Sequence, residues 1–351
     1  MKFLLAILLS FLACAAFGAE VLTLSDLPAT RLRFGSVSFY TENDKYFAGT
    51  DRNYTNGFKL SFLSTDLQSL TADPVPPALQ RLARAIGGLV PPGRDYKLGL
   101  ALGQNIYTPA DTAATAYLPH DRPYAAWLYA SAAFQIYRAP RVFASGWRAV
   151  GRLDVFEFSA GLIGPGALGQ QTQNGFHTLI GADHANGWPN QIHNEPGLEL
   201  AYERKYRFAT PHAREGWGAD LIPHAGATLG NIFAFANAGA EVRAGWRLPA
   251  DFGTNLIRPS GDSNSRRPDW SCFMFSAVDG RAVARDATLQ GNLFCSSASI
   301  GHRTFVGDFL AGFAFGTRQW QFTYSEAARS REFTGQPQRS VFGSISATYY
   351  Y

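Results

Sequence analysis

The sequence predicts an all-β protein, a transmembrane antiparallel β-barrel of about 12 strands, and three observations lead to this prediction. The first residues have the order expected of an export signal, and no apolar run outside that segment approaches the ~18 residues of a spanning helix. Its apolar residues instead recur at every second position, in segments of roughly 10–13 residues, the length that a tilted strand needs to cross a bilayer. Strands of soluble proteins are shorter, ~5–6 residues on average. We therefore expect one face of each strand to contact lipid.

Residues 1–19 have the order of a secretory signal peptide. Lys2 supplies a positive start, an apolar run follows, and small residues lead up to the expected cleavage point after Gly18 or Ala19. Cleavage leaves residues 20–351, which we expect to form one outer-membrane barrel domain, with any active site carried by its extramural loops.

The composition is unusual for a soluble protein. The chain has 351 residues with 35 Gly, 27 Phe and 15 Tyr, and only 17% of its residues are charged. The formal net charge of +4 falls to +3 once Lys2 is removed, which is too weak for a nucleic-acid-binding protein. Cys272 and Cys295 remain after cleavage. An even number of cysteines in an exported chain favours a disulfide bond, although two free thiols are the alternative.

The last residues show the alternation most clearly. One face carries Tyr351, Tyr349, Ala347, Ile345, Gly343 and Val341. The other carries Tyr350, Thr348, Ser346 and Ser344. An aromatic residue at the very C-terminus resembles the terminal strand that the barrel assembly machinery of the outer membrane recognises. We therefore expect that machinery to be a partner during biogenesis.

The same period of two recurs along the chain. It is seen around residues 55–62, 128–136, 198–205, 238–247 and 319–324. The polar face includes Glu203, Lys205, Glu241 and Arg243, which we expect to form ion pairs inside the lumen. A barrel of this size is filled largely by side chains, so it makes a poor general pore.

Two stretches lack this pattern. Residues 65–94 are rich in Pro, Leu and Arg, and a short helix is expected around Pro77–Ile86. Residues 163–196 are rich in Gly, Asn, Gln and His. Because connections of this length are uncommon unless they have a function, the second stretch is a candidate for chemistry.

Oxygen-rich side chains follow the first expected strand. Glu42, Asn43 and Asp44 precede a second polar group over residues 51–57 that includes Thr55. Carboxylate and amide oxygens are the ligands that Ca²⁺ prefers. The alternative is a hairpin loop in which Asn and Asp serve only the turn.

Two further groups of residues can act on a substrate. Arg122 can hold a phosphate through two parallel hydrogen bonds, or it can form a local pair with Asp121. In residues 163–196, His177 can be a general base for water, oriented by a carboxylate such as Asp183 or Glu195. The alternative is a polar loop with satisfied hydrogen bonds. No G-x-S-x-G motif marks a serine nucleophile.

Taken together, these motifs resemble the lipid A 3′-O-deacylase family of Gram-negative outer membranes. The matching segments appear in the family's order: residues 42–44, 51–57, 103–107, 121–125, 164–165, 173–177, 187–191 and 194–196. The resemblance implies a twelve-stranded barrel that depends on Ca²⁺ and hydrolyses the ester of the 3′ acyloxyacyl chain of lipid A. The implied partners are therefore lipopolysaccharide and the lipid of the outer membrane.

The resemblance also assigns roles to residues. Asn43 and Asp44 match metal positions and Thr55 an active-site position, while His177 matches the catalytic base. Either Asp183 or Glu195 is expected to assist the base. The candidate substrate-binding residues are Lys59, expected in the lumen together with Thr55, and Arg122, expected at a glucosamine phosphate.

Three other functions remain compatible with an outer-membrane barrel. A phospholipase would need a serine beside the base, a porin would conduct ions without changing any lipid, and an adhesin would use the loops to bind a partner. Lipid A mass spectrometry distinguishes the deacylase from all three.

Overall fold

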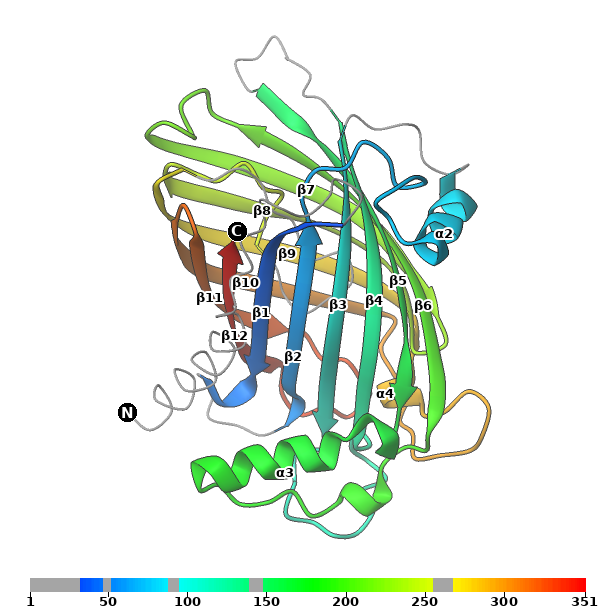
Figure 1. Cartoon of the computed structure of the whole chain (residues 1–351). Helices are drawn as coiled ribbons and strands as arrows, with labels where there is room; N and C mark the ends of the chain where they lie inside the picture. Colours follow the sequence, from blue (N-terminus) through cyan, green and yellow to red (C-terminus); the bar gives the residue numbers. More distant parts are fainter. Residues whose placement is uncertain (1–31, 47–51, 88–94, 139–147, 255–267) are drawn as a thin grey trace.

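Twelve antiparallel strands form one closed barrel in the computed structural model, which describes residues 32–46, 52–87, 95–138, 148–254 and 268–351. Each strand pairs with its sequence neighbours, and β12 closes the barrel on β1 (Figure 1). The predicted fold class and strand number are confirmed. The predicted signal peptide, residues 1–19, lies outside the described residues.

The strands are long, as the spacing of apolar residues predicts. They are β1 (Phe34–Asn43), β2 (Asn53–Ser64), β3 (Asp95–Thr108), β4 (Ala125–Arg138), β5 (Arg148–Ile163), β6 (Glu195–Ala209), β7 (Trp217–Gly230), β8 (Phe233–Trp246), β9 (Trp270–Asp286), β10 (Phe305–Thr317), β11 (Trp320–Arg329) and β12 (Ser340–Tyr350). Most exceed the 9–11 residues that cross a bilayer, so the wall extends beyond the hydrocarbon region.

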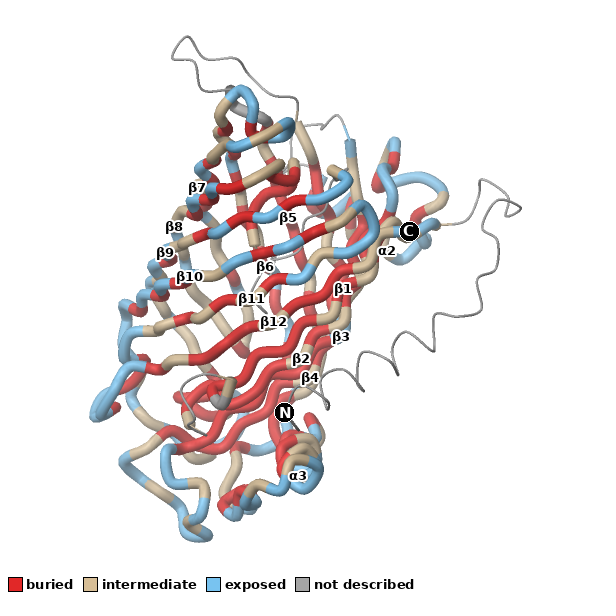
Figure 2. The backbone as a smooth tube through the Cα atoms, turned by 90° about the vertical axis from the view of Figure 1, so that its left-hand side faces the viewer, coloured by how far each residue is buried: buried red, intermediate tan, exposed pale blue. Residues whose placement is uncertain are grey.

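Side chains alternate between lumen and outer wall. Buried and exposed positions follow one another along β8 to β10 (Figure 2). The exposed positions carry large apolar side chains, among them Leu198, Leu229, Met274, Val278, Phe309 and Phe313. The lumen positions carry paired charges, since Lys205 lies 3.4 Å from Glu203 and Arg243 lies 3.8 Å from Glu241. The expected pairing of these four residues is confirmed, and an apolar outer wall over a charged interior is the arrangement of a membrane barrel.

The two longer helices mark opposite ends of the barrel (Figure 1). α2 (Pro77–Gly87) packs its buried Ala83 and Ile86 on the outside of the wall and confirms the helix expected there. α3 (Gly169–Ile180) crosses the other end, within a segment that the sequence presents only as a polar loop. Short elements complete the fold: η2 (Asp44–Tyr46), η3 (Pro165–Ala167), η4 (Trp188–Asn190) and α4 (Ala287–Gln290). Among the described residues, no helix has the length and apolar character needed to span a membrane.

The expected disulfide bond is wrong. Cys272 and Cys295 are both free and exposed. Cys272 lies near the start of β9, whereas Cys295 follows α4 beyond the other end of that strand. An extended strand rises about 3.3 Å per residue, so the two cysteines are separated by roughly the height of the barrel. A disulfide needs Cα atoms within about 7 Å.

Candidate active site

The predicted metal residues lie where β1 ends and β2 begins, at the α3 end of the barrel. Asn43 is the last residue of β1 and stands directly opposite Asn56 of β2. Asp44 begins η2, and its Oδ2 accepts a hydrogen bond from the backbone N–H of Arg52 at 2.6 Å. The oxygen-bearing side chains of Asn43, Asp44 and Asn56 are all buried. The amide oxygen of Asn56 has no hydrogen-bond partner among the described residues, so the site holds an oxygen suited to a ligand.

Thr55 lies on the outer face of the wall, and its expected place in the lumen is wrong. Tyr54 points inward, because its hydroxyl donates to Glu42 at 2.7 Å and its ring packs in the lumen. The pairing of β2 with β3 then shifts by one residue between Tyr54 and Asn56. This bulge turns Thr55 outward, where its Oγ1 lies 2.6 Å from Oγ1 of Thr108. One extra residue in a strand reverses the face of everything beyond it.

The segment that carries α3 covers this outer face. Nε2 of Gln104 on β3 donates to the carbonyl of Ala167 at 2.6 Å. Ile106 of β3 packs in one buried cluster with Trp188 of η4. Trp188 in turn donates from Nε1 to the side chain of Gln173 on α3 at 2.9 Å. The helix is thereby fixed over β3 and β4.

Glycine residues allow the close packing of α3. A Cβ atom on Gly169 would lie 2.5 Å from Cβ of Ala126 and 2.6 Å from the Trp188 ring, so a larger residue would lift the helix from the wall. Gly181 ends α3 with φ of +70° and directs its N–H to the carbonyls of His177 and Thr178.

His177 occupies the last turn of α3 and is buried, with 3% of its surface exposed. Its Nδ1 lies 2.5 Å from the backbone carbonyl oxygen of Asp183. Because a carbonyl only accepts hydrogen bonds, Nδ1 carries the proton in the neutral ring and Nε2 presents its lone pair. This tautomer is the one that a general base acting through Nε2 requires. The residue that orients the ring is therefore Asp183, through its main chain.

Glu195 has a structural position. One carboxylate oxygen accepts from the backbone N–H groups of Leu293 and Phe294, at 2.8 and 3.1 Å, and the other accepts from the amide of Asn231 at 3.0 Å. One oxygen thus holds the connection between β9 and β10 and the other holds the turn between β7 and β8, and this geometry does not support the expected assistance to His177.

The two predicted substrate-binding residues face the lumen. Lys59 is buried, with its Nζ 5.8 Å from the centre of the Tyr40 ring. Arg122 is fully buried, donates to Oγ1 of Thr288 at 2.9 Å and lies 3.4 Å from Glu332. The barrel wall separates both from the outer face that carries Asn43 and Thr55. Their role toward a substrate remains a prediction that these positions do not support.

The alternative local pair of Arg122 is also absent. Asp121 accepts instead from the backbone N–H groups of Ala110 and Arg122, at 2.8 and 2.7 Å.

Two residues at the α3 end of the barrel, Asn56 and Tyr46, were not predicted as site residues from the sequence. Asn56 lies within the polar motif of residues 51–57, and its place directly across from Asn43 depends on the register of the hairpin. Tyr46 of η2 contacts Oγ1 of Thr41 through its hydroxyl at 2.7 Å. Burial is the largest influence on this group and raises the pKa of Tyr46, so its phenol stays neutral.

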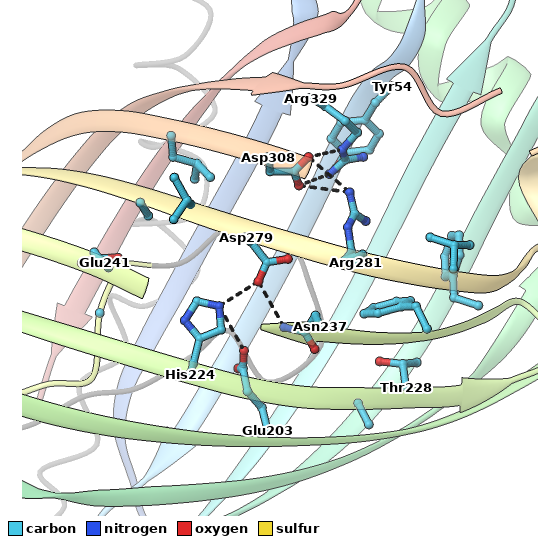
Figure 3. A pocket seen from close by; sticks show the side chains of 18 of the residues that line it. Tyr54, Glu203, His224, Thr228, Asn237, Glu241, Asp279, Arg281, Asp308 and Arg329 are labelled. Carbon is cyan, nitrogen blue, oxygen red and sulfur yellow. Dashed lines mark hydrogen bonds and ion pairs between the residues drawn. The ribbon is translucent and has the colours of Figure 1, made fainter. Parts of the chain in front are cut away.

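The lumen holds a second polar centre that the sequence did not single out (Figure 3). His224 lies 2.7 Å from Asp279, which also accepts from Asn237 at 3.1 Å. Nearby, Asp308 binds both Arg281 and Arg329. These groups line a cavity of about 140 Å³. Dense ion pairing therefore fills this part of the lumen.

The protein is an integral β-barrel of the outer membrane. This class is defined by the closed wall with its apolar outer face and by the polar site on one rim. More specifically, the chain belongs to the LpxR family of outer membrane proteins, whose family model matches residues 3–351.

One solved structure has the same fold. The chain is similar to LpxR from Salmonella typhimurium, with 21% sequence identity, a TM-score of 0.68, and coverage of 90% of this chain and 100% of that chain. Its likeness to the translocator domain of the autotransporter NalP from Neisseria meningitidis is much weaker, with 8% identity, a TM-score of 0.34, and coverage of 97% of this chain and 98% of that one. No curated protein matches the sequence.

Proposed function

We propose that this protein is an outer-membrane hydrolase that removes the 3′-linked acyloxyacyl chain from lipid A of lipopolysaccharide. The proposed reaction is a Ca²⁺-assisted attack on the ester by water that His177 activates. Membership of the LpxR family supports the class of substrate. The placement of Asn43, Thr55 and the α3 helix on the outer face of the wall supports the reaction, since an ester held in a bilayer can reach only that face.

The residues at the β1–β2 hairpin fit a calcium ion. Asn43, Asp44 and Asn56 offer amide and carboxylate oxygens, and the buried Asn56 oxygen lacks a partner among the described residues. Ca²⁺ takes six to eight such oxygens. When bound there, the ion would polarise the ester carbonyl and stabilise the charge that develops on its oxygen.

The base acts through a single ring nitrogen. The Asp183 carbonyl holds the proton on Nδ1 of His177, which leaves Nε2 to accept a proton from water as that water attacks the carbonyl carbon. The ester bond between the acyl chain and the 3′ oxygen then breaks. The 3′ oxygen of the sugar takes up the proton from Nε2 of His177 and becomes a hydroxyl, and the released acyl chain leaves as a carboxylate. General-base assistance of this kind contributes ~10²–10⁴ in rate.

The outer wall can hold the substrate in place. Leu102 is exposed on β3, two residues from Gln104, the residue that anchors the α3 segment. Leu60 stands directly opposite Leu102 on β2. These side chains continue from the polar site toward the middle of the barrel, so acyl chains can remain in the lipid while the sugar lies at the rim. The enzyme then does not need to extract its substrate from the membrane.

The observation that carries the proposal is the contact of Nδ1 of the buried His177 with the Asp183 carbonyl, in the segment that covers the outer face of the wall. Mass spectrometry of lipid A from cells that express the protein should show loss of one acyloxyacyl chain. His177→Ala and Asp44→Ala should abolish this loss while the barrel still folds. His193→Ala, a change at an exposed histidine of the same segment, is the matched control and should leave it intact. Unchanged deacylation in His177→Ala would remove the base from the mechanism.

The alternatives make different predictions in the same cells. A phospholipase would release fatty acid from glycerophospholipid and leave lipid A unchanged. A porin or an adhesin would leave both lipids unchanged.

A further inference from the structure

An open pocket of about 480 Å³ lies beside the candidate metal residues at the α3 end of the barrel. It is formed by residues at the start of β2 and by the connection between β11 and β12. Nη2 of Arg52 donates to Oε1 of Gln338 at 2.7 Å and joins these two parts. Arg331 and Arg339 also line the pocket. We call Arg52, Arg331 and Arg339 the rim arginines.

The pocket shares a residue with the candidate metal site. The backbone N–H of Arg52 donates to Oδ2 of Asp44 at 2.6 Å, while the side chain of Arg52 lines the pocket. Val341, another lining residue, lies two residues from Gly343 and therefore on the same face of β12. Gly343 stands directly opposite Asn43. The pocket thus borders the outer face of the wall, which is the face that carries Asn43.

The candidate metal residues lie between this pocket and α3. In the closed barrel, β12 is followed by β1, β2, β3 and β4. The pocket lies at the starts of β12 and β2, Asn43 ends β1, and α3 lies over β3 and β4. A substrate whose ester lies at the metal therefore has α3 on one side and the rim arginines on the other.

The charged side chains that line the pocket are all positive. The lining contains the three rim arginines and no Asp or Glu. Among the described residues, none of the three forms an ion pair, and their side chains donate only to neutral acceptors, Oε1 of Gln338 at 2.7 Å and the carbonyl of Pro337 at 2.9 Å. Arginines in the lumen are different, since Arg243 and Arg329 lie beside carboxylates there. The rim arginines are therefore the ones whose charge is available to an anionic ligand.

A ligand can reach the donors of these side chains. Arg331 and Arg339 are exposed, and Arg52 is half-buried. Each guanidinium has several N–H donors, and Arg52 and Arg331 each direct one terminal nitrogen to the protein. The planar group binds phosphate through two parallel hydrogen bonds. Three such groups around one pocket therefore suit a phosphate.

The structure of lipid A places a phosphate next to the scissile ester. On one glucosamine ring, the 3′ oxygen carries the acyloxyacyl chain and the neighbouring 4′ oxygen carries a phosphate. Substituents on neighbouring ring carbons stay close together, so an ester at the metal brings the 4′ phosphate to its immediate surroundings.

We propose that the rim arginines bind the 4′ phosphate of lipid A and thereby determine which ester of the substrate reaches the metal. The choice of ligand rests on the proposed function, which supplies lipid A as the substrate. The site differs from the one expected at Arg122, which is buried in the lumen.

Binding of lipid A to the full-length His177→Ala protein in detergent tests the pocket without turnover. The probes are lipid A with its 4′ phosphate and lipid A from which that phosphate has been removed, and native mass spectrometry gives both dissociation constants. The triple change Arg52→Gln, Arg331→Gln and Arg339→Gln should weaken binding of the phosphorylated probe at least about tenfold, as expected for the loss of charge-assisted bonds. It should not weaken binding of the dephosphorylated probe, which lacks the group that these side chains bind.

Three exposed arginines at the opposite end of the barrel provide the matched control. The changes Arg81→Gln, Arg84→Gln and Arg214→Gln remove the same charge outside the pocket. This control variant should bind both probes as tightly as the His177→Ala parent does.

Equal affinity of the parent for the two probes, or an equal loss of affinity in the rim and control variants, would overturn the proposal. A loss seen only with lipopolysaccharide that carries acidic core sugars, and not with lipid A, would overturn the assignment to phosphate.

Should the triple variant fail to fold, Arg339→Gln alone gives the answer, because the Arg339 side chain has no hydrogen bond or ion pair among the described residues. It should weaken binding of the phosphorylated probe at least about threefold, and unchanged affinity would contradict the site. Absence of acyl release by the wild-type protein would refute the proposed function without changing the comparison of the two probes.

Discussion

The Glu195→Gln change tests whether the Glu195 carboxylate acts in catalysis or only stabilises the fold. Glutamine keeps the length of the side chain and one oxygen. It removes the charge and places an NH₂ group where an oxygen now accepts from the amide of Asn231 at 3.0 Å. The remaining oxygen can still accept from the N–H groups of Leu293 and Phe294.

The magnitude follows from these three bonds. A hydrogen bond to a charged group contributes about 1.5–3 kcal/mol and a neutral one about 1 kcal/mol. The two bonds to Leu293 and Phe294 weaken to the neutral value, by about 0.5–2 kcal/mol each, so the local stability of residues 287–304 should fall by about 1–4 kcal/mol, while the bond lost to Asn231 loosens the turn between β7 and β8. The β-ladders do not depend on Glu195, so the barrel should stay closed. Because the Asp183 carbonyl orients His177, the rate of acyl release should fall far less than the ~10²–10⁴ expected when a general base is lost.

Two measurements on the purified variant decide the question. Hydrogen exchange should accelerate in residues 287–304, while the initial rate of acyl release from lipid A stays close to that of the wild type. His177→Gln, measured in parallel, defines the rate without a base. A hundredfold or greater loss in the rate of acyl release by Glu195→Gln, with hydrogen exchange in residues 287–304 unchanged, would refute the structural role. It would show that Glu195 acts in catalysis.

The remaining predictions concern the base, the metal, the bulge and the cysteines. Asp183→Asn should change acyl release only a few-fold, because the main-chain carbonyl that holds His177 is retained; a loss as large as that of His177→Gln would show that the carboxylate acts. Excess chelator should stop acyl release reversibly, with activity restored by added Ca²⁺. Full turnover in chelator would show that acyl release does not depend on the metal. Thr55→Val should lower the rate about tenfold or more while heat-modified gel mobility still reports a folded barrel, as a hydroxyl contact at the site is lost; an unchanged rate would exclude Thr55. A maleimide should label both Cys272 and Cys295 without reductant. Protection of both from labelling would instead support a disulfide bond between them.

Much of the fold follows from the sequence because a lipid environment enforces one strict rule. Every second side chain of a spanning strand must be apolar, and the polar remainder must find partners inside. Lys205 and Glu203 illustrate the rule, since their place in an alternating segment predicts both their lumen position and their pairing. The helix α2 was predictable for a similar reason, because its apolar residues recur at helical spacing after Pro77.

The site was harder to predict because its geometry depends on departures from regular alternation. A single bulge moves Thr55 from the lumen to the outer face. The α3 helix contains two glycines and no strong apolar period, so its sequence favours a loop, and it is fixed by contacts such as that of Trp188 with Gln173. Glu195 and Arg122 are ionisable residues beside a candidate site, but the partners that occupy them come from distant parts of the chain.

The most direct test of the deacylase mechanism is a single-substrate assay with purified protein, lipid A and Ca²⁺ in water enriched in ¹⁸O. Attack by water activated at His177 predicts that the released fatty acid gains ¹⁸O, that the 3′ hydroxyl of the sugar does not, and that His177→Ala releases no acid. Release of acid from glycerophospholipid but not from lipid A, or undiminished release by His177→Ala, would contradict the account.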